Sequence, residues 1–97
     1  MSVLGCLLDQ IYDEIDGVEE YGLLALKYKD SDRTLADMYN DLSKQEYTHF
    51  QLLYSQFTKR FSSLGELPEE MRQVYDWQME KITKDSAKAK AISDIYK

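Results

Sequence analysis

Apolar residues recur along this chain at intervals of three and four positions, which is the spacing of one face of an α-helix. The first such stripe consists of Leu4, Leu7, Ile11, Val18, Tyr21, Ala25 and Tyr28. A second stripe consists of Leu35, Tyr39, Leu42 and Leu53, with Phe50, Phe57, Phe61 and Leu64 extending the apolar surface alongside it. No segment alternates apolar and polar residues over the length of a strand, so the pattern predicts an all-α protein.

Turn-forming residues divide the chain into three predicted helices. The Asp-Ser-Asp sequence at 30–32 separates the first two, since its side chains are good N-caps for the helix that follows. Gly65 ends the second helix, and Pro68 suits the first turn of a third. We therefore expect one domain in which an antiparallel hairpin precedes a third helix, with helices at about residues 3–29, 33–63 and 68–96.

Composition and charge narrow the classes of function. The chain has 97 residues, a net charge of -6 and a pI near 4.7, a balance that disfavours binding to nucleic-acid phosphates. Its apolar stretches are far shorter than the roughly 20 residues that a membrane span needs. The first residues lack the basic region of a secretory signal, and the single cysteine, Cys6, excludes an internal disulfide. These features predict a cytoplasmic protein.

Three ionisable residues interrupt the apolar stripes. Glu14 stands in the middle of the first stripe, and Glu46 and His49 stand in the middle of the second. Because an unpartnered charge between packed helices is strongly destabilising, each of these side chains requires a partner. The partner is either another of these three residues or a bound metal ion.

Helix geometry predicts that the three residues meet at one level of the hairpin. Counting about 1.5 Å of rise per residue from a turn near Ser31, Glu14 lies about 25 Å along the first helix, and Glu46 and His49 lie about 22 and 27 Å along the second. Glu20 would lie only about 16 Å from the turn and off the stripe, so Glu14 is the better candidate. Glu46 and His49 also form the Glu-x-x-His arrangement by which helical bundles hold paired iron or manganese.

These residues resemble the ligand motifs of ferritin-like proteins, especially those of the rubrerythrin branch. The first-helix pattern there is a ligand Glu, a small residue three positions on, a Tyr seven on and an Ala eleven on, matched here by Glu14, Gly17, Tyr21 and Ala25. The second-helix pattern ends in Gln-Glu-x-x-His, matched at 45–49. The resemblance covers about residues 13–54. The compact three-helix layout is also similar to small ferritin-like proteins of phages and prophages.

The resemblance implies a role for each matched residue. Glu14 would be a terminal or bridging carboxylate, Glu46 a bridging carboxylate, His49 a terminal ligand and Tyr21 a hydrogen-bonding residue just outside the ligands. The family site usually takes four helices, whereas this chain has one such hairpin and one histidine, and so carries half a site. A homodimer, or a higher homo-oligomer, would complete a four-helix bundle and a shared di-iron site, as in the short encapsulated ferritins. Manganese or zinc would fit the same ligands.

The leading functional hypothesis is an iron-binding protein that oxidises ferrous iron or reduces peroxide. The alternative is a non-catalytic helical interaction module of phage or prophage origin that retains the fold, and iron storage in a larger cage is a third possibility. The three site residues could instead form a hydrogen-bonded cluster that fixes helix register without metal. For Tyr21, the alternative to a role in the site is packing between the helices. Glu80 is a further carboxylate considered as a metal ligand. Trp77 is expected to be a core or interface anchor.

Overall fold

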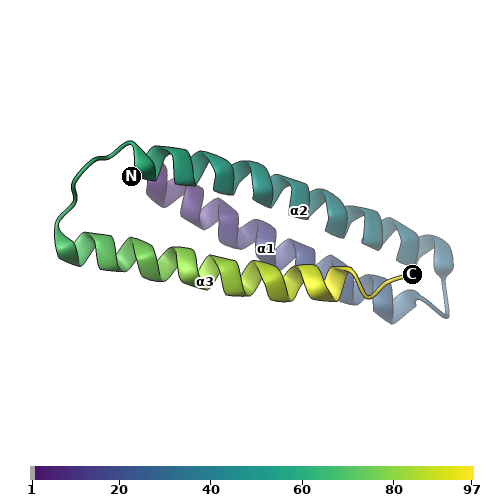
Figure 1. Cartoon of the computed structure of the whole chain (residues 1–97). Coiled ribbons are helices and arrows are strands. Elements are labelled where there is room, and N and C mark those ends of the chain that lie inside the picture. Colours follow the sequence, from purple (N-terminus) through teal and green to yellow (C-terminus); the bar gives the residue numbers. More distant parts are fainter. Residues whose placement is uncertain (1) are drawn as a thin grey trace.

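The computed structural model describes residues 2–97, and the predicted all-α fold is confirmed (Figure 1). Helix α1 spans Val3–Tyr28, α2 spans Arg33–Ser62 and α3 spans Glu69–Ser93. No strand occurs among these described residues. The ends of α1 and α2 lie one residue before the predicted ends, whereas α3 ends three residues before residue 96.

Helix α3 ends early because the chain that follows it turns back toward the start of α2. The Ile95 amide donates a hydrogen bond to the carbonyl of Ile92 at 3.2 Å, in the tighter turn that commonly closes a helix. Beyond this turn the hydroxyl of Tyr96 donates a hydrogen bond to Asp37 of α2. The apolar period that extends to residue 96 therefore continues in a docked tail rather than in a helix.

Side-chain caps begin α1 and α2. The Ser2 hydroxyl accepts a hydrogen bond from the Gly5 amide at 3.0 Å, and the Asp32 carboxylate accepts one from the Leu35 amide at 3.1 Å. The cap at Asp32 confirms the prediction that the turn supplies an N-cap for the second helix. Gly65 has a φ of +75°, the left-handed conformation in which glycine leads a chain away from a helix.

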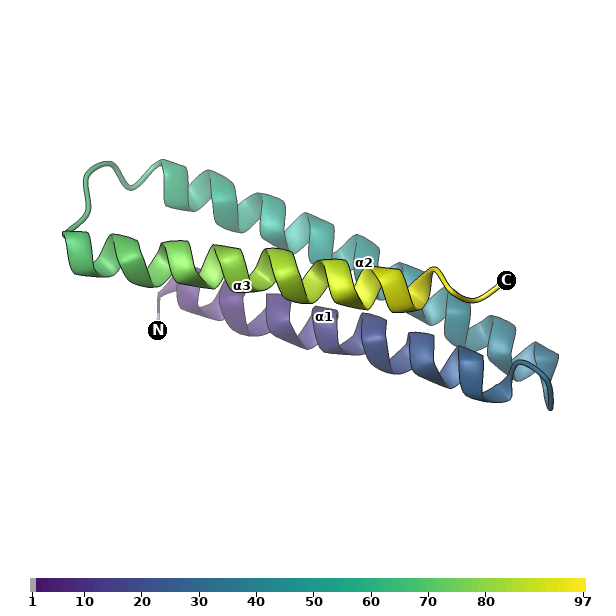
Figure 2. The same cartoon turned by 60° about the horizontal axis from the view of Figure 1, so that its bottom comes forward.

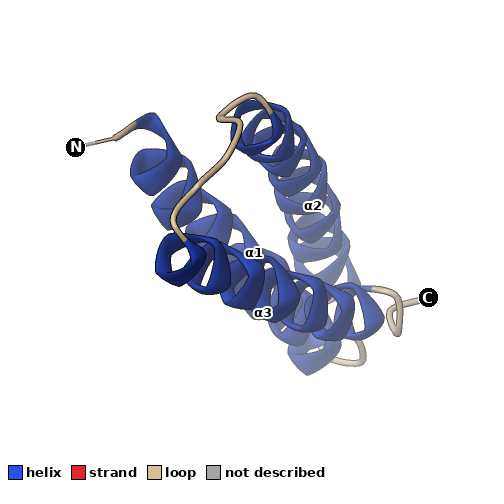
Figure 3. Ribbon diagram, turned by 60° about the vertical axis from the view of Figure 1, so that its left-hand side comes forward, coloured by secondary structure: helices blue, strands red, loops and turns tan. Residues whose placement is uncertain are grey.

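The three helices form an elongated bundle of 54 × 18 × 18 Å. Helices α1 and α2 are antiparallel, as predicted. Helix α3 lies alongside α1 and runs in the same direction as α1 (Figures 1 and 2). Helix α1 packs against both other helices, whereas α2 and α3 approach each other at few positions (Figure 3). Helix α3 therefore covers one face of the α1–α2 hairpin and leaves the opposite face open.

The core lies where α3 packs against the hairpin. Its buried apolar side chains are those of Leu4, Ile11, Ile15, Val18, Ala25, Ala36, Phe50, Phe57, Ile82 and Ala89. Leu64, which was expected to extend the apolar surface of the second helix, lies beyond the end of α2. Trp77, which was expected to be a core or interface anchor, lies on the solvent-facing side of α3 and is not part of the core. These two side chains are 46% and 58% exposed.

A buried polar contact joins all three helices and has no counterpart in the predictions. The hydroxyls of Ser43 and Ser93 lie 2.8 Å apart, and Ser43 donates a hydrogen bond to the carbonyl of Val18 at 2.7 Å. The ammonium group of Lys44 donates to the Ser93 carbonyl at 2.7 Å, at the end of α3 where the helix dipole favours a positive charge. Because these buried groups are paired, the contact fixes how α3 sits on the hairpin.

Two groups of large apolar side chains remain exposed. Met38 and Leu52 lie on the open face of the hairpin, while Met71, Val74 and Trp77 lie on α3. Met38 stands eleven positions before His49, and Leu52 stands three positions after it. Both spacings are close to whole numbers of helical turns, so the two residues lie on the same face of α2 as His49. Within residues 2–97, none of the helices offers the apolar length that a bilayer crossing requires.

Candidate metal centre

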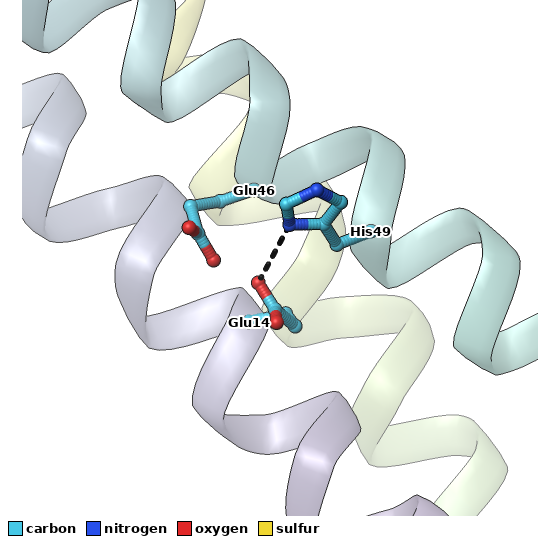
Figure 4. A group of neighbouring side chains, drawn as sticks. All are labelled: Glu14, Glu46 and His49. Atoms are coloured by element: carbon cyan, nitrogen blue, oxygen red, sulfur yellow. Dashed lines mark ion pairs between the residues drawn. The ribbon is translucent and has the colours of Figure 1, made fainter.

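Glu14 of α1 meets Glu46 and His49 of α2 between the two helices of the hairpin (Figure 4). One ligand atom from each residue lies within 4.8 Å of the others. The short turn between α1 and α2 and the constant rise of each helix bring the three residues to one level, as the sequence predicts. They form the only group of three or more potential metal ligands in the described part of the chain, and we call it the Glu14–Glu46–His49 cluster.

Hydrogen bonds among residues 2–97 leave one buried oxygen of this cluster unpaired. Oε2 of Glu14 is buried and accepts no hydrogen bond. Nδ1 of His49 lies 3.7 Å from this oxygen, which is too long for a hydrogen bond and is an ion pair only when the imidazole is protonated (Figure 4). Leaving a buried acceptor unpaired costs about 1–3 kcal/mol, and more when the acceptor is charged. A cation between the three side chains would remove this cost.

The cluster is open to solvent on the side of the hairpin that α3 does not cover. The side chains of His49 and Glu14 are 53% and 24% exposed. A surface hollow of about 310 Å³ adjoins them and is lined by Gln10, Glu14, His49, Leu52 and Leu53. In Figure 4 the three side chains lie in front of the pale ribbon of α3. A small molecule in this hollow would therefore contact the Glu14 and His49 side chains.

Two residues in the wall of this hollow, Gln10 and Leu52, were not predicted from the sequence. Gln10 stands four positions before Glu14, and Leu52 stands three positions after His49. Both spacings place a side chain on the same helix face as its ligand. The helical period could therefore have identified both residues once the ligands were chosen.

Tyr21 lies seven residues beyond Glu14 on the same face of α1, and its ring packs against α2. Its ring stacks on that of Tyr39 with 6.0 Å between ring centroids, and Tyr28 also stacks on Tyr39, at 6.1 Å. Among the described residues, no hydrogen bond joins the Tyr21 hydroxyl to the cluster. The three rings close the interface between α1 and α2 on the side nearer the turn.

The other carboxylates considered from the sequence lie outside the cluster. Glu20 is exposed on α1. Glu80 is exposed on α3, where it forms an ion pair with Lys84 at 3.7 Å. Neither belongs to the group whose ligand atoms converge.

Two carboxylates and one imidazole suit iron, manganese and zinc. Carboxylate oxygens are hard anionic ligands, and imidazole suits zinc and iron. Three protein donors leave coordination positions open, which is the arrangement of catalytic rather than structural sites. Comparison with known proteins gives no match among family models, curated proteins or solved structures.

Proposed function

We propose that this protein binds iron through Glu14, Glu46 and His49, and that it uses the metal to oxidise ferrous iron or to reduce peroxide. The observation that carries the proposal is the buried Oε2 of Glu14, which has no hydrogen-bond partner among residues 2–97. It belongs to a residue that has a ligand atom within 4.8 Å of ligand atoms of Glu46 and His49. A cation at this point would satisfy that oxygen and offset the paired negative charges. The resemblance to rubrerythrin-type motifs supports the same site.

The donor set favours iron on chemical grounds. Two anionic oxygens compensate the charge of a divalent ion, and carboxylates can change between one-oxygen and two-oxygen binding as the charge on the metal changes. Iron supplies one-electron chemistry when it is bound, whereas zinc would fit the same donors without redox activity. Manganese is the closest alternative to iron in both respects.

The protein residues have distinct tasks in this proposal. Glu14 and Glu46 would hold the cation and offset its charge, and His49 would bind it through a ring nitrogen. The hollow beside the cluster admits the small oxidant, and the apolar side chains of Leu52 and Leu53 limit the water that surrounds the open positions.

We also propose that a second copy of the chain covers the open hairpin face. One chain supplies two carboxylates and one imidazole, which is half of the donor set of a di-iron carboxylate site. Met38 and Leu52, which are 45% and 64% exposed, flank the cluster along this face. A two-fold axis through the hairpin face would bury both residues, bring two clusters together and complete a four-helix bundle.

Sedimentation of Leu52→Asp tests this dimer. The wild-type chain is expected to sediment as a dimer at micromolar concentration, and the variant as a monomer, because the substitution places a charge in the apolar part of the contact. Val74→Asp is the matched control, since Val74 is 57% exposed on α3 and lies away from the hairpin face. A wild-type monomer, or an equal loss of dimer in both variants, would contradict the arrangement.

Aerobic oxidation of ferrous iron tests the proposed activity. We expect the wild-type protein to accelerate oxidation over buffer, and His49→Ala to lower the rate at least tenfold because a metal ligand is lost. Absorbance of the ferric product measures the rate. The proposed activity is wrong if wild-type protein gives neither this acceleration nor faster consumption of peroxide in the presence of ferrous iron.

A second candidate function is binding of a protein partner through α3. Met71, Val74 and Trp77 are 46%, 57% and 58% exposed and follow one another at three-residue intervals, which is unusual for side chains of this size. This observation favours the interaction module considered above. A chain that binds no metal but loses a partner when Trp77 is replaced by alanine would have this function instead.

A further inference from the structure

Gly17 stands opposite Glu46 in the middle of α1. A Cβ atom at this position would lie 3.2 Å from both Cγ and Oε2 of Glu46, and 3.4 Å from Cδ. The first two distances are shorter than ordinary van der Waals contact. The space that a side chain at residue 17 would fill is therefore the space that the Glu46 side chain occupies.

The backbone gives no other reason for glycine at this position. Gly65 is the only glycine with positive φ among the described residues, so alanine could adopt the conformation of Gly17. Glycine inside a helix is unfavourable relative to alanine because it loses more conformational freedom on folding. Close contact with Glu46 is the feature that offsets this cost.

Gly22 on the same helix provides a contrast. A Cβ atom there would lie 3.3 Å from the backbone Cα of Ser93, so Gly22 permits α1 and α3 to pack closely. At Gly17 the neighbour is a flexible side chain that also belongs to the Glu14–Glu46–His49 cluster. A methyl group at Gly17 would displace Glu46 rather than a helix.

We propose that Gly17 is a positioning residue that seats the Glu46 carboxylate at the metal centre and so sets the affinity of the site. The inference rests on the proposed function, because it assumes that Glu46 is a ligand. Metal donors must lie within about 0.2 Å of their preferred distances, and an added Cβ would require Glu46 to shift by a few tenths of an ångström. Residues that orient a ligand typically change metal affinity by about 10–100-fold when they are replaced.

Metal titration of Gly17→Ala tests the inference in the full chain. We expect the affinity for ferrous iron to fall at least tenfold, and the visible absorption of bound cobalt(II) to change because the coordination geometry changes. The thermal midpoint of the metal-free variant is expected to stay unchanged or to rise, since alanine favours the helix. Gly22→Ala is the matched control, with a lower thermal midpoint and a metal affinity within twofold of wild type.

Metal titration of Gly17→Ala combined with Glu46→Ala shows whether Gly17 changes metal affinity by positioning Glu46. In the Glu46→Ala background, Gly17→Ala should cause no further loss of metal affinity, because the displaced side chain is already absent. An affinity within twofold of wild type for Gly17→Ala, or an equal loss in both backgrounds, would overturn the inference. Wild-type protein that takes up no metal would instead overturn the proposed function itself, together with this role for Gly17.

Discussion

Replacing Glu46 by glutamine is expected to remove bound metal from the protein while leaving its fold intact. The substitution preserves the shape of the side chain but removes one of the two negative charges that face the cation. No other group of three or more potential ligands converges in residues 2–97, so the loss of one donor leaves this site incomplete. We expect about one metal ion per wild-type chain, an affinity at least 100-fold lower in the variant, and no metal after gel filtration.

Elemental analysis of both proteins purified without chelator measures this effect. Glu20→Gln is the matched control, because Glu20 is an exposed carboxylate of α1 outside the cluster and should leave the metal content unchanged. Equal metal content in wild type and Glu46→Gln, with both chains folded by circular dichroism, would exclude Glu46 as a ligand.

Phe57→Ala is expected to lower the free energy of unfolding by about 3–5 kcal/mol, the range found when a buried aromatic side chain is truncated. Phe57 is 0% exposed, and its ring lies 6.3 Å from those of Tyr54 and Phe61 and 6.1 Å from that of Tyr75 on α3. Truncation leaves a cavity at the contact between α2 and α3, where few other residues meet.

Urea unfolding followed by circular dichroism measures this loss. Val74→Ala removes an apolar side chain that is 57% exposed and should change the free energy by less than about 0.5 kcal/mol. A loss below about 1 kcal/mol for Phe57→Ala, or a similar loss in both variants, would contradict the position of Phe57 at the centre of the core.

The level of the cluster could be predicted because it depends on local geometry alone. A short turn joins α1 and α2, so the distance of Glu14, Glu46 or His49 from that turn follows from the rise of a helix. The position of each residue within an apolar stripe then fixes the face on which it lies. These two constraints do not depend on any contact with α3.

The packing of α3 could not be predicted in the same way. Six residues, 63–68, join α2 to α3, and their length does not determine which of the two adjacent apolar surfaces of α2 the third helix covers. As a result, Phe50 and Phe57 form the buried centre, although the sequence placed them beside the main stripe. The contact between the Ser43 and Ser93 hydroxyls could not be predicted, because serine is polar and does not contribute to the spacing of apolar residues from which the helix faces were predicted.

Anomalous diffraction at the iron absorption edge tests the metal centre most directly, using crystals grown with ferrous iron in the absence of oxygen. The predicted result is a peak roughly 2 Å from a carboxylate oxygen of Glu14, a carboxylate oxygen of Glu46 and a ring nitrogen of His49. A map with no peak between these side chains, or with iron bound only at exposed carboxylates elsewhere, would contradict the site.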